Sequence, residues 1–348
     1  MTKIPIISDT HFGARSDSKV FLDYFLETYE SLLFPYCEHN QVKNIIHLGD
    51  FFDRRKYVNF HTLAEVKRRF VEPLRDMGVT VHCLIGNHDT YYKNTNRINS
   101  LAELLYGYDN FYLYDKPQSI NLYGVHFGMV SWINEENSEE VLEYIQNSNA
   151  EYLCGHFELN GFDVFRGIQF NEGFDPKLLS KFDRVFSGHF HCKQAKDNIL
   201  YVGNQYQMTF SDLYEEKGIH VLDTETRDLE FIPNPMRKFF KIDYDDSKND
   251  PLQQDFSIYK DCYVKIHVVT KEKPFTFDKF LDRLYSCNPA NVSVIETEEI
   301  VIDEHDTIDL QKGTLDILFD TVDTIEGVQD ADALKTLLRE LYMESLSL

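Results

Sequence analysis

The chain has 348 residues, of which 43% are hydrophobic and 14% aromatic, and its formal net charge is −23. This length predicts two domains, or one large domain with an appendage. The acidic charge argues against a protein that binds DNA through its own electrostatic field alone. The segment from Val294 to Leu348 has 3 Lys/Arg against 15 Asp/Glu, a net of −12. It predicts a solvated face or a docking surface for a basic partner.

The cysteines and the apolar runs indicate a cellular compartment. The six cysteines form no Cys-x-x-Cys pair, which predicts free thiols in a reducing environment. Met1 is followed within three residues by the apolar run Ile4–Ile7, without the basic and apolar regions of a secretory leader. No apolar run approaches the roughly 18 residues that a membrane span needs. We therefore expect a soluble cytoplasmic protein without a membrane partner.

The first third of the chain alternates strand-like and helix-like segments. Apolar runs predict strands at 4–8, 44–48 and 79–85, and helical spacing predicts helices at 21–34, 63–74 and 98–106. Such alternation favours an α/β fold with a mixed or parallel sheet. Predicted strands then become denser, at 111–114, 119–130, 151–154, 184–187, 199–202 and 218–222. This density indicates an extended sheet, or a second sheet packed on the first.

Pro233, Asn234 and Pro235 mark a domain boundary. Beyond them the pattern predicts a small α+β unit, with strands at 239–244, 262–269 and 291–296 and a helix at 277–285. Two amphipathic helices follow, at about 306–324 and 331–346. The second has an apolar stripe made of Leu334, Leu337, Leu338 and Leu341. We therefore expect domains at 1–232 and 236–297, and a helix pair at 305–348.

Five separated apolar strands end in residues that can bind a metal ion. In chain order these residues are Asp9 and His11; Asp50 and Asp53; Asn87, His88 and Asp89; His156; and His189 and His191. In four of the five motifs a glycine directly precedes the first polar residue, which lets the backbone turn sharply and lets a ligand come close. Because ligand sites in α/β sheets gather at the carboxyl ends of the strands, we expect these side chains to converge on one cavity.

The number of donors points to two metal ions. A single catalytic zinc takes about three protein ligands, whereas seven donors suit two ions about 3.5–4 Å apart that share a carboxylate, as in phosphoester hydrolysis. Imidazole and oxygen donors without thiolate favour Mn²⁺, with Fe²⁺ and Zn²⁺ as alternatives. Each motif alone is weak, because a buried histidine or an Asn/Asp turn is common in any core. Five in order make coincidence a poor explanation.

The series D-x-H, G-D-x-x-D, G-N-H-D, G-H and G-H-x-H resembles the signature of the calcineurin-like metallophosphoesterases, over about residues 1–230. The length, the small domain, the final helix pair and the stretch HFELNGF at 156–162 are similar to the nuclease subunit of double-strand-break repair complexes. That subunit is of the SbcD or meiotic-recombination-eleven type, and the similarity is greatest to its branch in T-even-like bacteriophages.

The resemblance implies a metallophosphoesterase β-sandwich flanked by helices, a small α+β capping domain and a C-terminal helix pair. It implies a metal-dependent DNA exonuclease and endonuclease that acts in recombination, repair and replication with two divalent ions, Mn²⁺ first. The implied partners are DNA and an SMC-like coiled-coil ATPase, with the nuclease forming a homodimer inside a heterotetramer. For a phage-encoded chain the location is the host cytoplasm.

The resemblance also assigns roles, residue by residue. It assigns one ion to the ligands Asp9, His11, Asp50 and His191. It assigns the other ion to Asp50, Asn87, His156 and His189. His88 faces the phosphate as a general acid or transition-state stabiliser, oriented by a hydrogen bond from Asp53. At Asp53 the chain departs from archaeal relatives, which resemble G-D-x-x-H. Asp89 is expected to bond the local backbone.

Further residues are candidates for contacts with DNA or with another protein, and some of them have a simpler structural explanation. Arg54, Arg55 and Lys56 could contact a DNA backbone, although a solvated loop explains them equally well. Phe21, Phe25 and Tyr29 are candidates for a dimer contact. The stripe Leu334, Leu337, Leu338 and Leu341 could bind the coiled coil of the ATPase or pack on its own domain. Trp132 is expected to pack in the core or in a loop.

Two other functions stay open at this point. A phosphatase or cyclic-nucleotide phosphodiesterase needs only the first 230 residues, but it leaves the small domain and the helix pair without a role. A scaffold that has lost its metals would have lost ligands, and all seven are present.

Overall fold

The computed structural model describes residues 2–165, 167–296, 319, 322, 334, 335, 338 and 339. The chain divides into two compact units, the first made of Met1–Met208 and Tyr214–Lys238. The second unit has the short segment Thr209–Leu213 and the chain from Phe239 onward. The division at Phe239 lies a few residues after the boundary expected at the Pro-Asn-Pro sequence.

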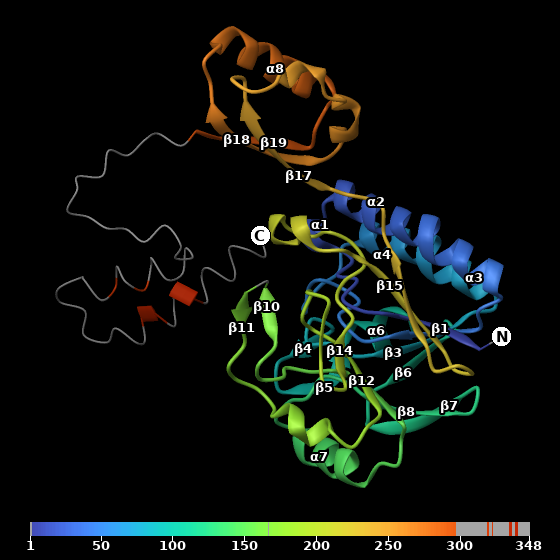
Figure 1. Cartoon of the computed structure of the whole chain (residues 1–348). Helices are drawn as coiled ribbons and strands as arrows, with labels where there is room; N and C mark the ends of the chain where they lie inside the picture. Colours follow the sequence, from blue (N-terminus) through green and yellow to red (C-terminus); the bar gives the residue numbers. More distant parts are fainter. Residues whose placement is uncertain are drawn as a thin grey trace. The chain divides into compact units, whose positions relative to one another are not determined.

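Two six-stranded sheets form the first unit (Figure 1). The first sheet has the order β16 (Leu229–Pro233), β15 (Gly218–Asp223), β1 (Lys3–Ile7), β2 (Asn44–His47), β3 (Thr80–Leu84) and β6 (Phe111–Tyr114). The second has the order β13 (Gln194–Lys196), β14 (Ile199–Tyr201), β12 (Arg184–Gly188), β9 (Tyr152–His156), β8 (Val125–Val130) and β7 (Gln118–Leu122). In each sheet four neighbouring strands are parallel. The other two pair in antiparallel fashion: β15 and β16 at one edge of the first sheet, and β13 and β7 at the two edges of the second.

The main core lies between the two sheets. Its buried side chains come from both of them, for example Ile4 and Ile46 from the first and Met129 and Phe186 from the second. Strands that are covered on both faces need apolar residues at nearly every position, which is why these segments read as continuous apolar runs. The predicted fold class, an α/β sandwich flanked by helices, is confirmed.

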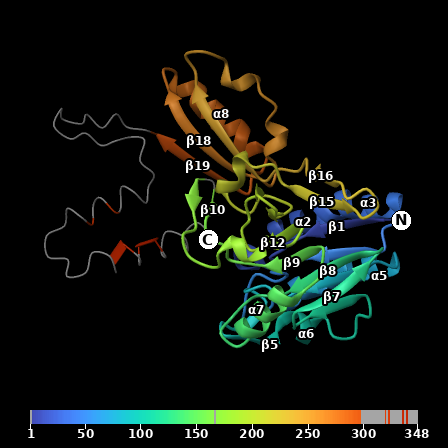
Figure 2. The same cartoon turned by 60° about the horizontal axis from the view of Figure 1, so that its bottom comes forward.

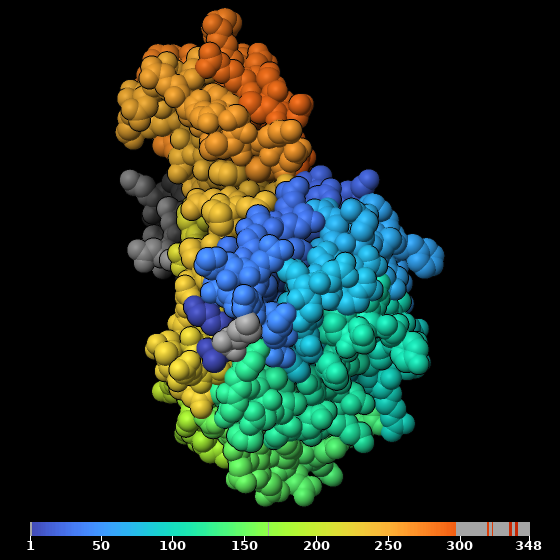
Figure 3. Space-filling model, turned by 90° about the vertical axis from the view of Figure 1, so that its right-hand side faces the viewer, coloured from blue at the N-terminus to red at the C-terminus, as the bar shows by residue number. Residues whose placement is uncertain are grey.

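Helices cover the outer faces of the sandwich. On the second sheet, α7 (Ser138–Asn147) packs Val141 and Ile145 against Leu153 of β9 (Figure 2). The remaining helices of this unit are α1 (Ala14–Asp17), α2 (Lys19–Thr28), α3 (Phe34–Asn40), α4 (Phe60–Val66), α5 (Glu72–Asp76) and α6 (Ser100–Leu104). Figure 3 shows α2 to α5, in blue and cyan, as one continuous outer face of this unit.

The three aromatic residues proposed for a dimer contact are instead part of the core. Phe21, Phe25 and Tyr29 have 0% exposure. Phe25 stacks on Tyr206 with ring centroids 3.9 Å apart, and Tyr29 meets Phe70 edge-on at 4.8 Å. The helical spacing of these residues correctly indicates an apolar face, but Phe70 and Tyr206 of the same chain already cover that face. The expectation of a dimer contact through them is wrong.

Two predicted elements differ from the observed ones. The strand expected at 119–130 is a hairpin of β7 and β8, whose turn at Tyr123 and Gly124 has positive φ angles of 54° and 84°. The helix expected from 98 begins only at Ser100, because Asn99 caps it by accepting a hydrogen bond from Ala102 N. The residues before it form a hairpin of β4 (Thr90–Tyr92) and β5 (Thr95–Asn99), which the apolar pattern did not reveal.

The second unit is a three-stranded parallel sheet with a helix on one face. Its elements are β17 (Phe239–Asp245), β18 (Tyr263–Thr270), α8 (Pro274–Ser286) and β19 (Asn291–Glu296). Alternate strand residues such as Val264 and Ile266 face Phe277 and Phe280 of the helix. The sequence predicted all four elements, because each has a clear period of two or of 3.6 residues.

The C-terminal helix pair predicted at 305–348 lies almost wholly outside the described residues. Of its apolar stripe, the structure describes Leu334 and Leu338, both helical and half-buried, while Leu337 and Leu341 are outside. Across the described chain, none of the helices is both long enough and apolar enough to cross a membrane.

Candidate metal centre

The five motifs lie at the carboxyl ends of parallel strands from both sheets. Asp9, Asp50 and Asn87 follow β1, β2 and β3 of the first sheet, while His156 ends β9 and His189 follows β12 of the second. These strands are neighbours within their sheets, so their ends form one edge of the sandwich. The seven predicted ligands therefore come together as expected for an open α/β sheet.

Two glycines make this convergence sterically feasible. A Cβ on Gly86 would lie 2.1 Å from Asp50 Oδ1, far inside van der Waals contact. A Cβ on Gly49 would lie 2.7 Å from His156 Nδ1, and the φ angle of Gly49 is +103°. The glycine that precedes a polar residue in these motifs thus provides room for the neighbouring ligand.

The ligand residues themselves have unusual backbone conformations. Asp9, His11, Asp50 and His189 have positive φ angles of 52°, 40°, 55° and 89°. A non-glycine residue in this region costs on the order of 1–3 kcal/mol and persists where the surroundings enforce it. Four such residues at one place indicate a site whose geometry is imposed by function.

The first cluster of donors surrounds the Nε2 atom of His11. This atom lies 3.0 Å from His191 Nε2 and 3.6 Å from Asp50 Oδ2, and His191 Nε2 lies 3.8 Å from Asp9 Oδ1. The four residues are the set that the resemblance assigned to one ion.

The second cluster surrounds the side-chain oxygen of Asn87. Asn87 Oδ1 lies 2.9 Å from His156 Nε2 and 3.0 Å from His189 Nδ1. His156 Nε2 is also 3.5 Å from Asp50 Oδ2. One oxygen of Asp50 therefore faces both clusters, as a bridging carboxylate must.

Outer contacts determine which ring nitrogen each histidine offers. His156 Nδ1 is 2.8 Å from the carbonyl oxygen of Leu48, which can only accept, so Nδ1 holds a hydrogen and the neutral ring, the form that binds a metal, presents the lone pair of Nε2. His189 Nε2 contacts Glu158 Oε1 at 3.1 Å, which leaves Nδ1 facing Asn87. Such outer partners are usual for metal-binding histidines. Sequence reasoning missed Glu158, two residues after His156, because a carboxylate at that spacing has no distinctive signal.

The electrostatics of the cavity favour cations. Burial opposes protonation of His11 and His156, but the carboxylates of Asp53 and Asp50 outweigh it and raise the pKa of each imidazole to about 9. Burial also works against ionised Asp50, yet His156 and His88 hold its pKa well below the usual range. The cavity thus stabilises positive charge strongly.

The donor set fits divalent metal ions. Asp9 and Asp50 have 0% and 1% exposure, and among the described residues neither forms an ion pair with Lys or Arg. Buried carboxylates need a compensating cation, and three groups of His and Asp atoms lie close enough to hold one. With Asn87 beside them, the donors divide into two sets that share Asp50.

His88 is held beside the clusters by the backbone. Its N–H donates to Asp50 Oδ1 at 2.8 Å, and its ring Nδ1 lies 2.5 Å from the main-chain carbonyl oxygen of Asp53. The expected hydrogen bond from the Asp53 side chain is therefore wrong in detail, because that carboxylate instead faces His11 Nδ1 at 3.4 Å. Burial lowers the pKa of His88, so its imidazole is neutral at physiological pH.

Asp89 bonds the local backbone, as predicted. Its side-chain oxygens accept hydrogen bonds from the N–H groups of Phe51, Phe52 and Gly86 at 3.0, 3.2 and 2.9 Å. It thereby ties the loop after β2 to the loop after β3. Burial and the nearby Asp50 raise the pKa of Asp89 to about 7.

The basic stretch after the second motif has aromatic partners. Arg54 lies over the ring of Tyr57 at 5.0 Å, and Lys56 lies 6.0 Å from the ring centroid of Tyr91. Arg55 contacts Thr90 Oγ1 at 3.5 Å, which links the loop to the β4–β5 hairpin. Sequence reasoning missed these tyrosines, although three consecutive basic residues followed by a tyrosine were a usable signal.

The chain is similar in sequence to several known proteins. The chain is 30% identical over 349 residues to exonuclease subunit 1 of Enterobacteria phage T4, which covers 99% of each chain. It is 26% identical over 286 residues to the SbcD subunit of the nuclease SbcCD of Staphylococcus epidermidis, covering 70% of this chain and 73% of that one. It is 25% identical over 204 residues to the DNA double-strand break repair protein Mre11 of Sulfurisphaera tokodaii, covering 56% and 50%.

These relatives are nucleases or repair proteins by name, as the resemblance implied. The family model described as calcineurin-like phosphoesterase matches residues 2–193, a range that contains all five motifs. The chain therefore belongs to the calcineurin-like phosphoesterase family.

Proposed function

We propose that this chain is a two-metal DNA nuclease, with exonuclease and endonuclease activity, and a subunit of a recombination and double-strand-break repair complex. The observation that carries the proposal is Asp50 Oδ2, which faces the imidazole nitrogens of both donor clusters. Relatives named as nuclease subunits support DNA as the substrate. The ligands of one ion are Asp9, His11, Asp50 and His191, and those of the other are Asp50, Asn87, His156 and His189.

When bound, two divalent ions supply positive charge to the phosphate and lower the pKa of a coordinated water. The mixed imidazole and oxygen donors favour Mn²⁺ for this role. The chain's own residues keep the ligands oriented: Glu158 and the carbonyl of Leu48 fix the ring nitrogens that face the ions.

His88 carries the proton in the proposed mechanism. Its Nδ1 hydrogen is donated to the carbonyl of Asp53, so neutral His88 offers Nε2 as a proton acceptor. In hydrolysis the water oxygen forms a bond to phosphorus, the bond to the leaving oxygen breaks, and a proton reaches that oxygen. The proton that the water loses passes to solvent, and His88, after taking up a proton, can donate it to the leaving oxygen, which is the role of a general acid.

The rest of the proposed complex is what the resemblance to the SbcD-type nucleases implies, and the charge of the chain supports it. A protein with a net charge of −23 gains little DNA affinity from its own field, so a basic groove has to come from a partner. We assign that role to an SMC-like coiled-coil ATPase, bound by the helix pair at 305–348, with the nuclease as a homodimer in the host cytoplasm. Residues 236–297 act as the capping domain, and Arg54, Arg55 and Lys56 meet the DNA backbone beside the ions.

The test is an assay of labelled linear duplex DNA with Mn²⁺-loaded protein, with and without the ATPase and ATP. We expect Mn²⁺-dependent cutting that Asp50→Ala abolishes. A chain truncated before residue 300 should keep simple nuclease activity and lose the ATPase. If metal-loaded protein hydrolyses a chromogenic phosphodiester but never DNA, the chain is a phosphatase or a cyclic-nucleotide phosphodiesterase instead.

A further inference from the structure

Trp132, the one tryptophan of the chain, lies against the second donor cluster. The centroid of its ring is 5.4 Å from the ring of His189, with 37° between the planes, and 6.0 Å from the ring of His156. Its side chain is only half-buried. Trp132 lies in the loop after β8, one of the two places expected for it, but its indole also flanks two predicted metal ligands and remains partly open to solvent.

The main chain of Trp132 is held on both sides. Its N–H donates to the carbonyl of Ile85 at 2.8 Å, and its carbonyl oxygen accepts from Asn96 Nδ2 at 2.8 Å and Asn137 Nδ2 at 3.0 Å. Asn134 in turn donates to Asn96 Oδ1 at 2.8 Å. A residue with this many main-chain bonds has little backbone freedom, so the point from which its indole projects is fixed.

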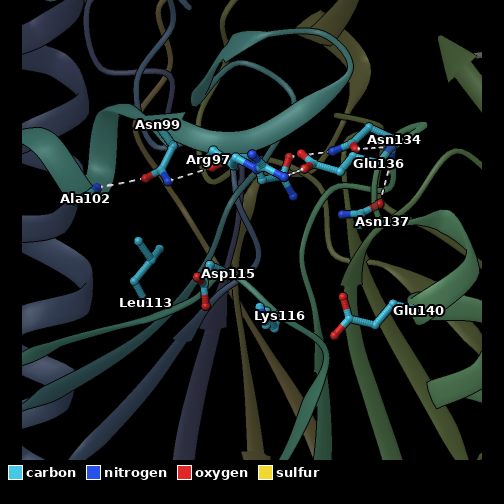
Figure 4. A pocket seen from close by; sticks show the side chains of 11 residues that line it. Arg97, Asn99, Ala102, Leu113, Asp115, Lys116, Asn134, Glu136, Asn137 and Glu140 are labelled. Carbon is cyan, nitrogen blue, oxygen red and sulfur yellow. Dashed lines mark hydrogen bonds and ion pairs between the residues drawn. The ribbon is translucent and has the colours of Figure 1, made fainter.

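The asparagines belong to the wall of a pocket of 610 Å³, shown in Figure 4. Asn134 and Asn137 lie at one side of this pocket, near Glu136, and Arg97 reaches toward them. The residues that line the pocket include none of the seven predicted ligands. The pocket is therefore not the metal centre, and its polar wall acts as the support that fixes the strand end carrying Trp132.

The indole shows the features of a contact surface. The N–H of a buried tryptophan usually has a hydrogen-bond partner. Within the part of the chain that the structure describes, the indole N–H of Trp132 has no hydrogen-bond acceptor, and the side chain belongs to neither of the two core clusters formed by the strands of the sandwich. A fixed, half-open aromatic face beside a metal centre is suited to bind a planar group of the substrate.

We propose that Trp132 stacks on a nucleobase next to the phosphate that is cleaved. The inference rests on the proposed DNA nuclease function and adds a recognition element to it: the ligand is a planar base, of any sequence, that has left its own stack. Stacking on an aromatic side chain contributes about 1–3 kcal/mol per base and tolerates every sequence. Trp132 therefore favours substrates with an unpaired or frayed nucleotide at the position of cleavage.

A substrate–protein double-mutant cycle tests this contact. Trp132→Leu keeps an apolar cover on His189 but removes the stacking face, and an abasic nucleotide placed in turn at each position around the cleaved bond removes the base. At one position the wild-type protein should lose about 10-fold in kcat/KM on the abasic strand, and Trp132→Leu should lose about the same on the intact strand. The two losses should not add. Tyr106→Leu, which removes an exposed aromatic ring outside the site, is the matched control and should change neither rate.

A binding experiment decides the same point without catalysis. The only tryptophan fluorescence of the chain comes from Trp132, so quenching by a short single-stranded oligonucleotide in Ca²⁺ reports a base on its ring. We expect quenching by the intact strand and a much smaller change with a strand that is abasic at the identified position. Equal quenching by both strands would overturn the inference. So would losses in kcat/KM that add at every position together with a lower metal content of Trp132→Leu, because Trp132 would then only cover His189. If the intact strand is never cut but is bound with base-dependent quenching, the nuclease proposal fails and the stacking contact stands.

Discussion

The carboxylate of Asp53 contacts His11: Asp53 Oδ1 lies 3.4 Å from His11 Nδ1, on the side of the ring away from the other donors. Meanwhile the main-chain carbonyl of Asp53 holds His88. One residue thus serves two neighbours through different groups. Mutation of the side chain should affect His11 and leave the support of His88 intact, which separates metal binding from proton transfer.

Asp53→Asn should therefore weaken the first metal ion and spare the chemistry. Loss of an outer partner of a ligand histidine typically lowers metal affinity by about 10- to 100-fold. We expect the Mn²⁺ concentration for half-maximal activity to rise by that factor, with the rate at saturating Mn²⁺ close to that of the wild type. A rate that stays low at every Mn²⁺ concentration would show that the carboxylate acts in the reaction itself.

His88→Gln should have the opposite effect. Its ring is outside the two donor sets, so both ions should still bind, while DNA hydrolysis falls by about 10²- to 10⁴-fold, the range for a lost acid–base group. Metal content by elemental analysis and the cleavage rate have to be measured on the same sample. A protein that has lost one ion would instead place His88 among the ligands.

Gly86→Ala should displace the bridging carboxylate of Asp50 although no ligand residue is replaced. The new Cβ would meet Asp50 Oδ1 at 2.1 Å and Asp50 N at 2.3 Å, so Asp50 has to move. We expect a loss of about 1–3 kcal/mol in the free energy of unfolding, as for other overpacked sites, and reduced binding of both ions. Gly107→Ala is the control, because nothing lies within 4 Å of the added atom; its φ of +98° can lower stability there, but it should leave metal binding unchanged. Equal metal binding by both variants would contradict the steric account.

Buried neutral histidines predict the acid sensitivity of the fold. Burial lowers the pKa of His82 to about 4, and it does the same for His220. In the unfolded chain each has a pKa near 6.5, so between about pH 6.5 and 4 the unfolded state binds protons that the folded state does not. Each histidine contributes its full stabilisation above about pH 6.5. As the pH falls below that value the free energy of unfolding decreases by about 1.4 kcal/mol per pH unit for each residue.

The measurement is urea unfolding between about pH 4.5 and 7.5 in the presence of a chelator, a window that includes the unfolded pKa near 6.5 and most of the interval down to the folded value. His82→Gln should reduce the pH slope by the share of one histidine. Tyr114→Phe removes the hydroxyl that lies 2.6 Å from His82 Nδ1, so it should lower stability but keep the slope. An unchanged slope in His82→Gln would show that other groups dominate the acid sensitivity.

The sequence predicted the strands that carry the ligands, because each is a continuous apolar run between two covered faces. It predicted the convergence of the ligands for the same reason, since parallel strands bring their carboxyl ends together. The outer contacts were not predictable in this way. Glu158, the carbonyl of Leu48 and the indole of Trp132 meet the ligands only through tertiary packing, and no local pattern marks them.

The turn at Tyr123 and Gly124 shows a second kind of limit. The apolar alternation continues on both sides of it, and the run has two glycines, Gly124 at the turn and Gly128 inside β8, so a glycine alone did not mark the turn. Similarly, the apolar face of α2 was visible in the sequence, but whether a sheet or another subunit covers it depends on the rest of the fold. Periodicity reveals that a face is buried and does not reveal by what.

Each proposed ion takes ligands from both sheets of the sandwich. His191 from the second sheet completes a set that otherwise comes from the first, and Asp50 and Asn87 from the first face His156 and His189 from the second. The ions would therefore act as clamps across the open end of the sandwich, where the hydrophobic core gives way to a polar cavity. Separation of the sheets at this end would divide both ligand sets at once, so metal release should accompany the first opening of the fold rather than follow its complete unfolding.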